Sequence, residues 1–333
     1  MDCNGNMAAA RKAKNDEFYT LREDIDRELP HYFNCFRDKV VYCNCDDPEQ
    51  SNFFKYFDEN FDALGLRGLV ATYYSPDGAS YVSGISRVGE KLVEVRTKLS
   101  GNGDFRSVEC MDILASCDVV VSNPPFSLAR EYISMLMESG KAFLIINNLN
   151  SAICKAVFPF LNDNRMWLGN TSPKRFLQPD GSLRSFGNVV WYTNIDIPKR
   201  HRPLSLDCLY SGNEGRYPSY DNYDAIDVSR VSDILYDYDG TMGVPVTFLE
   251  KYCPEQFEIL GVTKSWCGLA SKIYPEQVQV SADGSRKVVS KLNDSPARIR
   301  RPLDKGTYYE CNGTEYVAMY QRILIRKMKD PGV

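Results

Sequence analysis

Asp118-Val119-Val120-Val121-Ser122-Asn123-Pro124-Pro125-Phe126 is the stretch that decides the fold class of this chain. A short apolar run is followed by a polar residue and two consecutive prolines. Because proline lacks an N–H and has a fixed φ, a strand ladder cannot continue through residues 124 and 125. The stretch therefore predicts a buried strand that ends in a rigid turn. Open α/β sheets carry their chemistry at the carboxyl ends of their strands, so we expect this turn to lie in a functional site.

The side chains of the turn indicate one kind of chemistry. Asn123 offers a carbonyl acceptor, and Pro124 has a backbone carbonyl without an N–H. Two acceptors beside the aromatic face of Phe126 suit the exocyclic amino group of a planar base. We therefore expect amino-group methylation, with Asn123, Pro124, Pro125 and Phe126 as catalytic residues and Phe126 stacking on the base. The alternative is a plain Pro-Pro turn that closes a strand.

Strands and helices alternate on both sides of this turn. The pattern predicts an α/β fold with a largely parallel, doubly wound, Rossmann-like sheet that carries helices on both faces. A hairpin insertion is expected at 74–99. Strands are expected at 39–43, 67–73 and 141–147, and helices at 17–36 with a break near Pro30, at 51–61 with a cap at Ser51, at 127–137 and at 151–161.

The pattern changes after about Asn162. Short β-like pieces are expected at 165–168 and 186–194, and tyrosine, aspartate, glycine and proline are interleaved through 210–238. We place a domain boundary near Pro198, which predicts a catalytic domain at 1–198 and a second, mixed α+β region at 199–333.

Composition narrows the class of protein. The chain has 333 residues, 43% of them hydrophobic and 25% charged, which is typical of a globular protein. No apolar run approaches the length of a membrane span and the N-terminus has no signal-peptide pattern, so we expect a soluble, cytoplasmic protein. The eleven cysteines include no C-x-x-C and there are only two histidines, so we expect reduced thiols and no metal site.

Positive charge is concentrated in two places although the net charge is −4. One is Lys199-Arg200-His201-Arg202. The other is the last part of the chain, which from Arg286 onward holds eleven Lys or Arg against five Asp or Glu. Charge alone leaves two interpretations open, contact with nucleic acid and a solvated basic face.

The loop after the first predicted strand, Asn44-Cys45-Asp46-Asp47-Pro48, is the expected cofactor site. Its carboxylates suit a ligand with an ammonium group, ribose hydroxyls and a sulfonium, and they would repel a pyrophosphate. Neither G-x-G-x-x-G nor G-K-[ST] is present there, which disfavours dinucleotide and ATP binding. The alternative is that Asp46 and Asp47 only cap the next helix. Asp112 is a further candidate, as an acceptor for an adenine amino group.

Several segments together resemble the EcoRI-type adenine-specific modification methyltransferases, and the resemblance covers nearly the whole chain. They are Lys14 to Thr20, Val40 to Pro48, Ser51 to Phe57, Tyr238 to Leu249 and Gln256 to Gly261.

The resemblance implies an S-adenosylmethionine-dependent enzyme of a restriction-modification system that methylates adenine N6 in double-stranded DNA. It implies that Phe18, Tyr19 and Thr20 line the cofactor site, with Asp46 or Asp47 beside it, and that 199–333 recognises the target. Pairing with a restriction endonuclease would go with this function. The chain departs from the broader methyltransferase pattern because it lacks an F-x-G-x-G loop.

A target base must leave the duplex, and aromatic side chains can stack on it. Besides Phe126, we expect Trp191 or Tyr192 to serve in stacking, with core packing as the alternative. Other amino-group acceptors remain open: cytosine N4, an RNA base or a protein glutamine, as does a catalytically inactive DNA-binding homologue. Cytosine-C5 methylation is disfavoured because no Pro-Cys dipeptide occurs.

Overall fold

A computed structural model describes residues 18–178, 180–274, 276–289, 295–300 and 306–328. The chain divides into two compact units, Met1–Ile197 and Pro198–Val333, which are described separately. In the described residues no helix is both long and apolar enough to cross a membrane.

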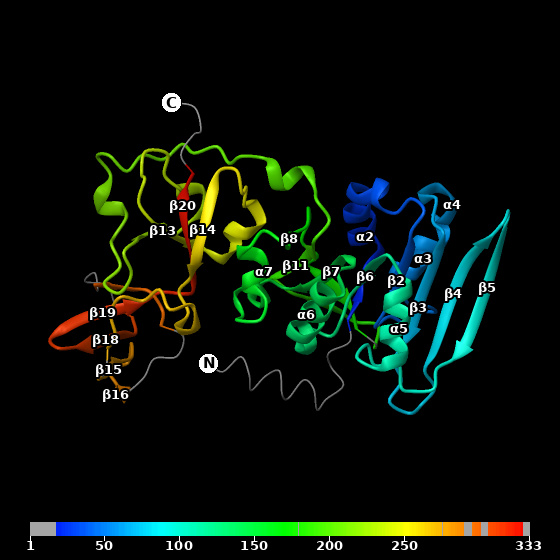
Figure 1. Cartoon of the computed structure of the whole chain (residues 1–333). Helices are drawn as coiled ribbons and strands as arrows, with labels where there is room; N and C mark the ends of the chain where they lie inside the picture. Colours follow the sequence, from blue (N-terminus) through cyan, green and yellow to red (C-terminus); the bar gives the residue numbers. More distant parts are fainter. Residues whose placement is uncertain (1–17, 179, 275, 290–294, 301–305, 329–333) are drawn as a thin grey trace. The chain divides into compact units, whose positions relative to one another are not determined.

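The first unit is built on an eight-stranded sheet with the order β5-β4-β3-β2-β6-β7-β11-β8 (Figure 1). The four central strands, β3, β2, β6 and β7, are parallel, and the outer pairs are antiparallel. The strands are β2 (Val40–Cys43), β3 (Gly68–Tyr73), β4 (Tyr81–Val88), β5 (Lys91–Lys98), β6 (Val119–Ser122), β7 (Ala142–Asn148), β8 (Trp167–Leu168) and β11 (Val189–Thr193).

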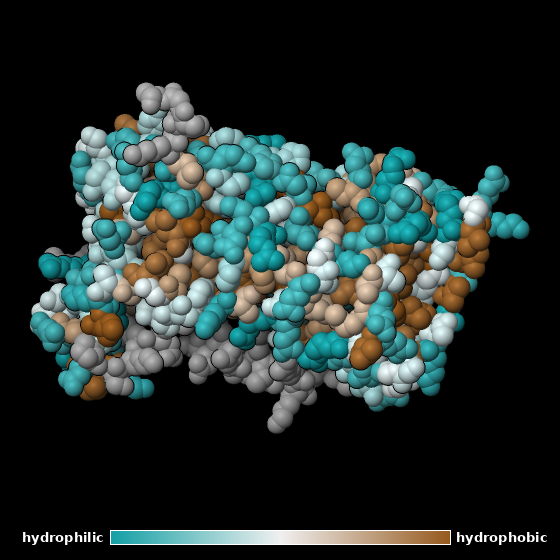
Figure 2. Space-filling view, in the orientation of Figure 1, coloured by the Kyte–Doolittle hydropathy of each residue, from teal (hydrophilic) through white to brown (hydrophobic). Residues whose placement is uncertain are grey.

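The prediction of a largely parallel sheet is therefore correct only for its centre. The hairpin expected as an insertion at 74–99 is β4–β5, and it extends the sheet as two antiparallel edge strands. All eight residues of β5 are exposed, among them Val93 and Val95. In Figure 2 brown, the colour of hydrophobic residues, lies along this outer edge of the sheet. The short β11 and β8 close the other edge.

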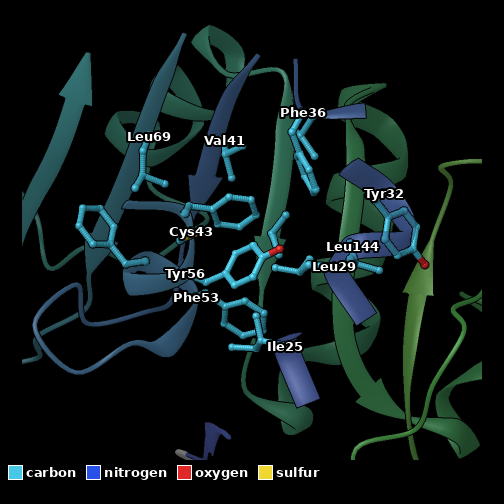
Figure 3. Packing of buried hydrophobic residues seen from close by; sticks show 14 of the residues in the cluster. Ile25, Leu29, Tyr32, Phe36, Val41, Cys43, Phe53, Tyr56, Leu69 and Leu144 are labelled. Carbon is cyan, nitrogen blue, oxygen red and sulfur yellow. The ribbon is translucent and has the colours of Figure 1, made fainter. Parts of the chain in front are cut away.

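One face of the sheet packs against the helices α2 (Arg22–Glu28) and α3 (Asn52–Glu59). Figure 3 shows Ile25, Phe53 and Tyr56 lying against strand residues Val41 and Leu69. The Ser51 hydroxyl caps α3 by accepting hydrogen bonds from the N–H groups of its first turn, at 3.1 and 3.2 Å. This face holds the large hydrophobic core of the unit.

Other helices cover the opposite face. Tyr42 alternates with the core-facing Val41 and Cys43, so Asn44 falls on the same side as Tyr42. The hydroxyl of Tyr132, from α6, donates a hydrogen bond to the Asn44 side chain on that side. The remaining α-helices of the unit are α4 (Phe61–Leu64), α5 (Val108–Ser116), α6 (Ala129–Ser139) and α7 (Phe158–Asn162).

Two of the predicted helices are shorter than expected. The helix predicted at 17–36 is α2 followed by a 3₁₀ segment, Leu29–Cys35, in which Pro30 cannot donate an α-helical hydrogen bond. Residue 17 lies outside the described residues. The helix predicted at 151–161 is a 3₁₀ segment, Leu149–Ile153, and α7, whose first turn contains Pro159.

A small sheet ties the N-terminal segment to the rest of the first unit. Strand β1 (Tyr19–Thr20) pairs with β9 (Arg175–Leu177), which pairs with β10 (Leu183–Ser185), all antiparallel. The sequence pattern had placed residues 18–20 in a helix. Their pairing partners lie more than 150 positions further along the chain, so local periodicity could not identify them.

The second unit consists of two sheets in which most neighbouring strands are antiparallel. A four-stranded sheet has the order β12-β13-β20-β14, and a five-stranded sheet has the order β16-β15-β18-β19-β17. The strands are β12 (Ile226–Asp227), β13 (Met242–Pro245), β14 (Phe257–Val262), β15 (Gln277–Val280), β16 (Arg286–Val289), β17 (Arg298–Arg300), β18 (Tyr308–Cys311), β19 (Thr314–Ala318) and β20 (Arg322–Lys327).

The mixed α+β prediction for 199–333 is wrong for the part of this unit that the structure describes. Its helical segments are all 3₁₀ turns of three to six residues, the longest being Val246–Lys251.

Candidate functional site

A cavity opens at the carboxyl ends of the parallel strands β2, β3 and β6. Its empty volume, including the open mouth, is about 960 Å³, which is sufficient for a nucleoside-sized ligand. Five segments of the first unit line it: Phe18 and Tyr19; Cys45, Asp46 and Asp47; Tyr73 and Tyr74; Gly103, Asp104, Phe105 and Arg106; and Asn123, Pro124, Pro125, Phe126 and Leu128.

The Asn123 side chain is held in one orientation. Its amide nitrogen donates a hydrogen bond to the backbone carbonyl of Phe18. Since that carbonyl can only accept, the nitrogen must face it, and the amide oxygen must face the other way. This Oδ1 is buried and has no hydrogen-bond partner among the described residues. The turn thus presents an oriented acceptor whose hydrogen bond is not made within the protein.

Asp46 provides a second buried acceptor. The residue is 8% exposed, and its Oδ2 has no partner among the described residues. Burial raises the pKa of Asp46 to about 7, the hydrogen bond from Ser51 opposes the rise, and the charge of Asp47 adds to it. A carboxylate in this state favours a ligand that brings hydrogen-bond donors or positive charge.

Asp47 shapes the loop that carries Asp46. One of its oxygens accepts hydrogen bonds from the N–H of Glu49 and the hydroxyl of Tyr81, both at 3.0 Å. Asp47 therefore both lines the cavity and holds the turn that leads to α3. Capping of α3 itself falls to Ser51, not to either aspartate.

Buried hydrogen bonds connect this loop to the turn after β6. The Ser122 hydroxyl, one residue before Asn123, donates to the backbone carbonyl of Asn44, and the Tyr132 hydroxyl donates to the Asn44 side chain. All three side chains are at most 1% exposed. The relative position of the two lining segments is therefore fixed from below the cavity.

One wall of the cavity forms where the backbone of Gly103 passes close to the backbone of Tyr73. Gly103 has φ +78°, and a Cβ at this position would lie 2.4 Å from the Tyr73 carbonyl oxygen. Next to it, Arg106 donates to both carboxylate oxygens of Asp104 at 2.9 and 2.6 Å. These hydrogen bonds hold the pKa of Asp104 below its usual range, so Asp104 stays ionised and its charge is balanced by Arg106 in the same wall.

Three phenylalanines surround the ring of Phe126. Phe126 lies 6.0 Å from Phe18, 6.2 Å from Phe176 and 5.9 Å from Phe186, measured between ring centroids. Phe18 and Phe186 meet edge to face at 4.9 Å. We call Phe18, Phe126, Phe176 and Phe186 the phenylalanine cluster. It attaches the small sheet to the turn after β6.

The structure brings together most of the residues selected from the sequence. Phe18, Tyr19, Asp46, Asp47 and the turn from Asn123 to Phe126 line the same cavity, although they come from three distant parts of the chain.

Four of the selected residues do not line it. Thr20, the second residue of β1, is buried, and its carbonyl accepts a hydrogen bond from Asn52. Asp112 lies on the exposed side of α5, whose buried side contains Cys110 and Leu114. Asp104 is the acid that reaches the cavity from that part of the chain.

The base-stacking role predicted for Trp191 and Tyr192 needs correction. Both side chains are 0% exposed. Trp191 packs edge to face on Phe53 in the main core, and the Tyr192 hydroxyl donates to the carbonyl of Asn148 at 2.9 Å. Since both side chains of β11 are fully buried, no base can reach them without opening the core, and core packing explains them.

The sequence had not indicated that Tyr73, Tyr74 and the segment Gly103 to Arg106 line the cavity, whereas Cys45 belongs to the loop expected at the cofactor site. One signal was present, because Tyr73 ends a strand next to the Asp46 strand in the parallel part of the sheet. Gly103 lies next to Tyr73 because the β4–β5 hairpin, which separates them in the chain, returns to the same edge of the sheet. No local sequence pattern predicts this contact.

The basic residues of the second unit are not equivalent. Arg322 is buried and forms an ion pair with Asp227 at 2.9 Å, and Arg298 is 2% exposed and lies over Tyr274. Lys287, Arg300 and Arg326 are exposed. Lys291, Arg301, Lys305 and Lys329 lie outside the described residues.

Comparison with known proteins agrees with the resemblance seen in the sequence. The family model described as adenine-specific methyltransferase EcoRI matches residues 6–328. The chain is 46% identical to Type II methyltransferase M.EcoRI of Escherichia coli, over 77% of this chain and 88% of that protein. It is 40% identical to Type II methyltransferase M.MpnI of Mycoplasma pneumoniae, over 75% and 83% of the two chains.

A third relative is Type II methyltransferase M.MgeORF184P of Mycoplasma genitalium, with 37% identity over 75% of this chain and 84% of that protein. No solved structure matches the chain significantly. The match over nearly the whole length, together with the identity to three relatives, shows that this chain belongs to the EcoRI family of adenine-specific methyltransferases.

Proposed function

We propose that this protein is a DNA methyltransferase that uses S-adenosylmethionine to methylate N6 of an adenine extruded from double-stranded DNA. The single observation that carries the proposal is the Asn123 amide, whose nitrogen is held by Phe18 while its buried oxygen remains without a partner at a cavity. Such an oxygen is suited to accept a hydrogen bond from an amino group.

The cavity has the chemistry that the cofactor requires. Asp46 supplies an unpartnered buried oxygen for an ammonium or hydroxyl donor, and Tyr73, Tyr74 and Phe105 add aromatic walls beside it. Phe18, Tyr19 and Asp47 complete the lining, with Phe18 beside the catalytic turn. When bound, S-adenosylmethionine supplies an electrophilic methyl group on a positively charged sulfur.

The catalytic turn acts by holding the amine. Asn123 Oδ1 and the Pro124 carbonyl oxygen accept hydrogen bonds from N6–H, which draws the nitrogen lone pair out of conjugation with the ring. Pro125 keeps the turn rigid, and Phe126 stacks on the base. These groups act by positioning and by preorganised acceptors, so no covalent enzyme intermediate is required.

The two units are assigned different tasks. We assign 1–198 to cofactor binding and catalysis, with a Rossmann-like, doubly wound sheet as its frame, and 199–333 to recognition of the target sequence. Relatives that are named Type II methyltransferases support a restriction-modification role, in which a restriction endonuclease acts on the same site.

The test is transfer of labelled methyl groups to duplex DNA, followed by identification of the modified nucleoside by mass spectrometry. N6-methyladenine is expected, and N4-methylcytosine, or label in RNA or protein only, would refute the proposal. Asn123→Ala should retain cofactor affinity within about threefold and lose turnover by at least about a hundredfold. Asn150→Ala, at an exposed asparagine, is the matched control and should keep wild-type turnover.

A further inference from the structure

An arginine lies beside the phenylalanine cluster and has no part in the cavity. The Arg184 guanidinium carbon is 5.3 Å from the centroid of the Phe18 ring and 5.0 Å from that of Phe186. The residue is exposed, and it is not among the residues that line the cavity. A cation stacked on two rings is held in place while one edge of its guanidinium still faces solvent.

The strand register explains this position. Arg184 of β10 lies directly opposite Phe176 of β9, and Phe176 lies opposite Thr20 of β1. Residues directly opposite each other in antiparallel strands share a face of the sheet. Arg184 is therefore on the face that packs against Phe126, whereas the neighbouring Arg175 is on the other face.

These two arginines differ in whether an acidic side chain pairs with their charge. Arg175 donates to Glu23 at 3.0 Å. No ion pair involves Arg184 within the parts of the chain that the structure describes. A guanidinium is always charged and has five donors in a planar fork, which matches an oxygen anion. Arg184 is thus a preorganised positive group that no described acidic residue neutralises.

We propose that Arg184 binds a backbone phosphate next to the extruded adenine. The inference rests on the proposed function, in which Phe126 stacks on that base. The phosphates that flank a nucleotide are joined to its base through the sugar, and Arg184 stands one aromatic ring away from Phe126. By holding this phosphate, Arg184 stabilises the extruded nucleotide without reading its sequence.

The experiment compares Arg184→Ala with Arg175→Ala, after the target site has been found by sequencing DNA that the wild-type enzyme has methylated. Arg184→Ala should lower kcat/KM for duplex DNA by about tenfold to a hundredfold. It should also reduce the salt slope of duplex binding by about one counterion. Arg175→Ala should change neither value, and thermal unfolding should show both variants folded.

A methylphosphonate scan then locates the contact. Replacing one charged phosphate beside the target adenine should impair the wild type and have no further effect on Arg184→Ala, because the contact is already lost. Equal losses in both enzymes at every position would overturn the proposal, as would an unchanged salt slope.

Weaker cofactor binding in Arg184→Ala would also overturn it, because the anion would then be the carboxylate of the cofactor. The proposed function fails by a different result, namely no methyl transfer to duplex DNA by the wild type.

Discussion

At the scale of single residues, the site contains two buried acceptors, Asn123 Oδ1 and Asp46 Oδ2, that have no hydrogen-bond partner among the residues that the structure describes. Leaving a buried acceptor unpaired costs about 1–3 kcal/mol in the free protein. Both atoms lie in residues that line the same cavity, so the bound ligands can recover this free energy. The arrangement is preorganised: the acceptors are already desolvated and oriented before the ligands arrive.

Asp46→Asn should stabilise the free protein and weaken cofactor binding. Because the pKa of Asp46 is raised to about 7, its ionisation opposes folding as pH rises from about 4 through 7. The wild-type penalty is therefore complete above pH 7, on the order of 2–4 kcal/mol. Urea unfolding at pH 8 and pH 4 should show a stabilised variant at pH 8 and a smaller difference at pH 4.

The pH dependence of cofactor affinity provides the second measurement. In the wild type, affinity should rise as Asp46 ionises through about pH 7, and in Asp46→Asn it should be lower and flat across this range. A variant that follows the wild-type profile would show that another group titrates.

At the scale of elements, the two-residue strand β1 depends on a buried carboxylate elsewhere in the unit, that of Glu28, whose hydrogen bonds we call the clamp. Glu28, at the end of α2, is 0% exposed, and its carboxylate accepts hydrogen bonds from the N–H groups of Asn170 and Thr171 at 2.7 Å and from the Tyr32 hydroxyl at 2.8 Å. This fixes the segment that leads into β9, and β9 pairs with β1, next to Phe18. The Asn123 orientation thus depends on a carboxylate that is remote in sequence.

Glu28→Gln should destabilise the protein by about 3 kcal/mol, because an amide would place its own donors against the N–H groups that Glu28 now accepts. Glu23→Gln on the same helix is the control. Its side chain is 53% exposed, so we expect a change within about 0.5 kcal/mol. Denaturant unfolding measures both, and equal midpoints for the two variants would contradict the clamp.

Gly103→Ala should disrupt the cavity wall. A Cβ at this residue would lie 2.4 Å from the Tyr73 carbonyl oxygen, so the loop must move. Cofactor affinity should fall at least about tenfold, with about 1–3 kcal/mol of lost stability. Gly89→Ala isolates the backbone effect, because Gly89 has a similar φ of +64° and no atom within 4 Å of the added Cβ. Calorimetric titration should show wild-type affinity in that control.

At the scale of the whole molecule, the first unit contains the cavity, and the second unit presents exposed cations on one of its sheets. In the second unit, Lys287 and Arg300 stand at the two ends of one row across the five-stranded sheet, through Gln279, Tyr309 and Tyr316. Arg286 is on the opposite face and pairs with Glu310 at 3.0 Å. The row offers two exposed cations that can approach a phosphate backbone.

Duplex affinity should fall steeply with salt, and Lys287→Ala and Arg300→Ala should each reduce the slope of log affinity against log salt by about one. Arg286→Ala should leave the slope unchanged because its charge is already paired on the other face. Fluorescence anisotropy from 50 to 200 mM salt is the measurement. Identical slopes in all three variants would exclude this row from the DNA contact.

The sequence alone determined the turn after β6, the α/β alternation, the cofactor loop with Asp46 and Asp47, and the family. These features are local: prolines end a strand, periodicity marks an element, and motif residues are adjacent in the chain. The lining of one cavity by these segments also follows from the rule that parallel strands present their carboxyl ends at one edge.

The tertiary structure decided what depends on distant contacts. The pairing of β1 with β9, which no local pattern predicts, helps to bring the Phe18 carbonyl to Asn123, 105 residues away. Trp191 and Tyr192 are buried in the core and so lie outside the site. Asp112 lies on the exposed side of α5, and Asp104 is the residue that lines the cavity wall. A residue type specifies what a side chain can do. Which side chains meet depends on packing between segments that are far apart in the chain, and such contacts leave no local pattern in the sequence.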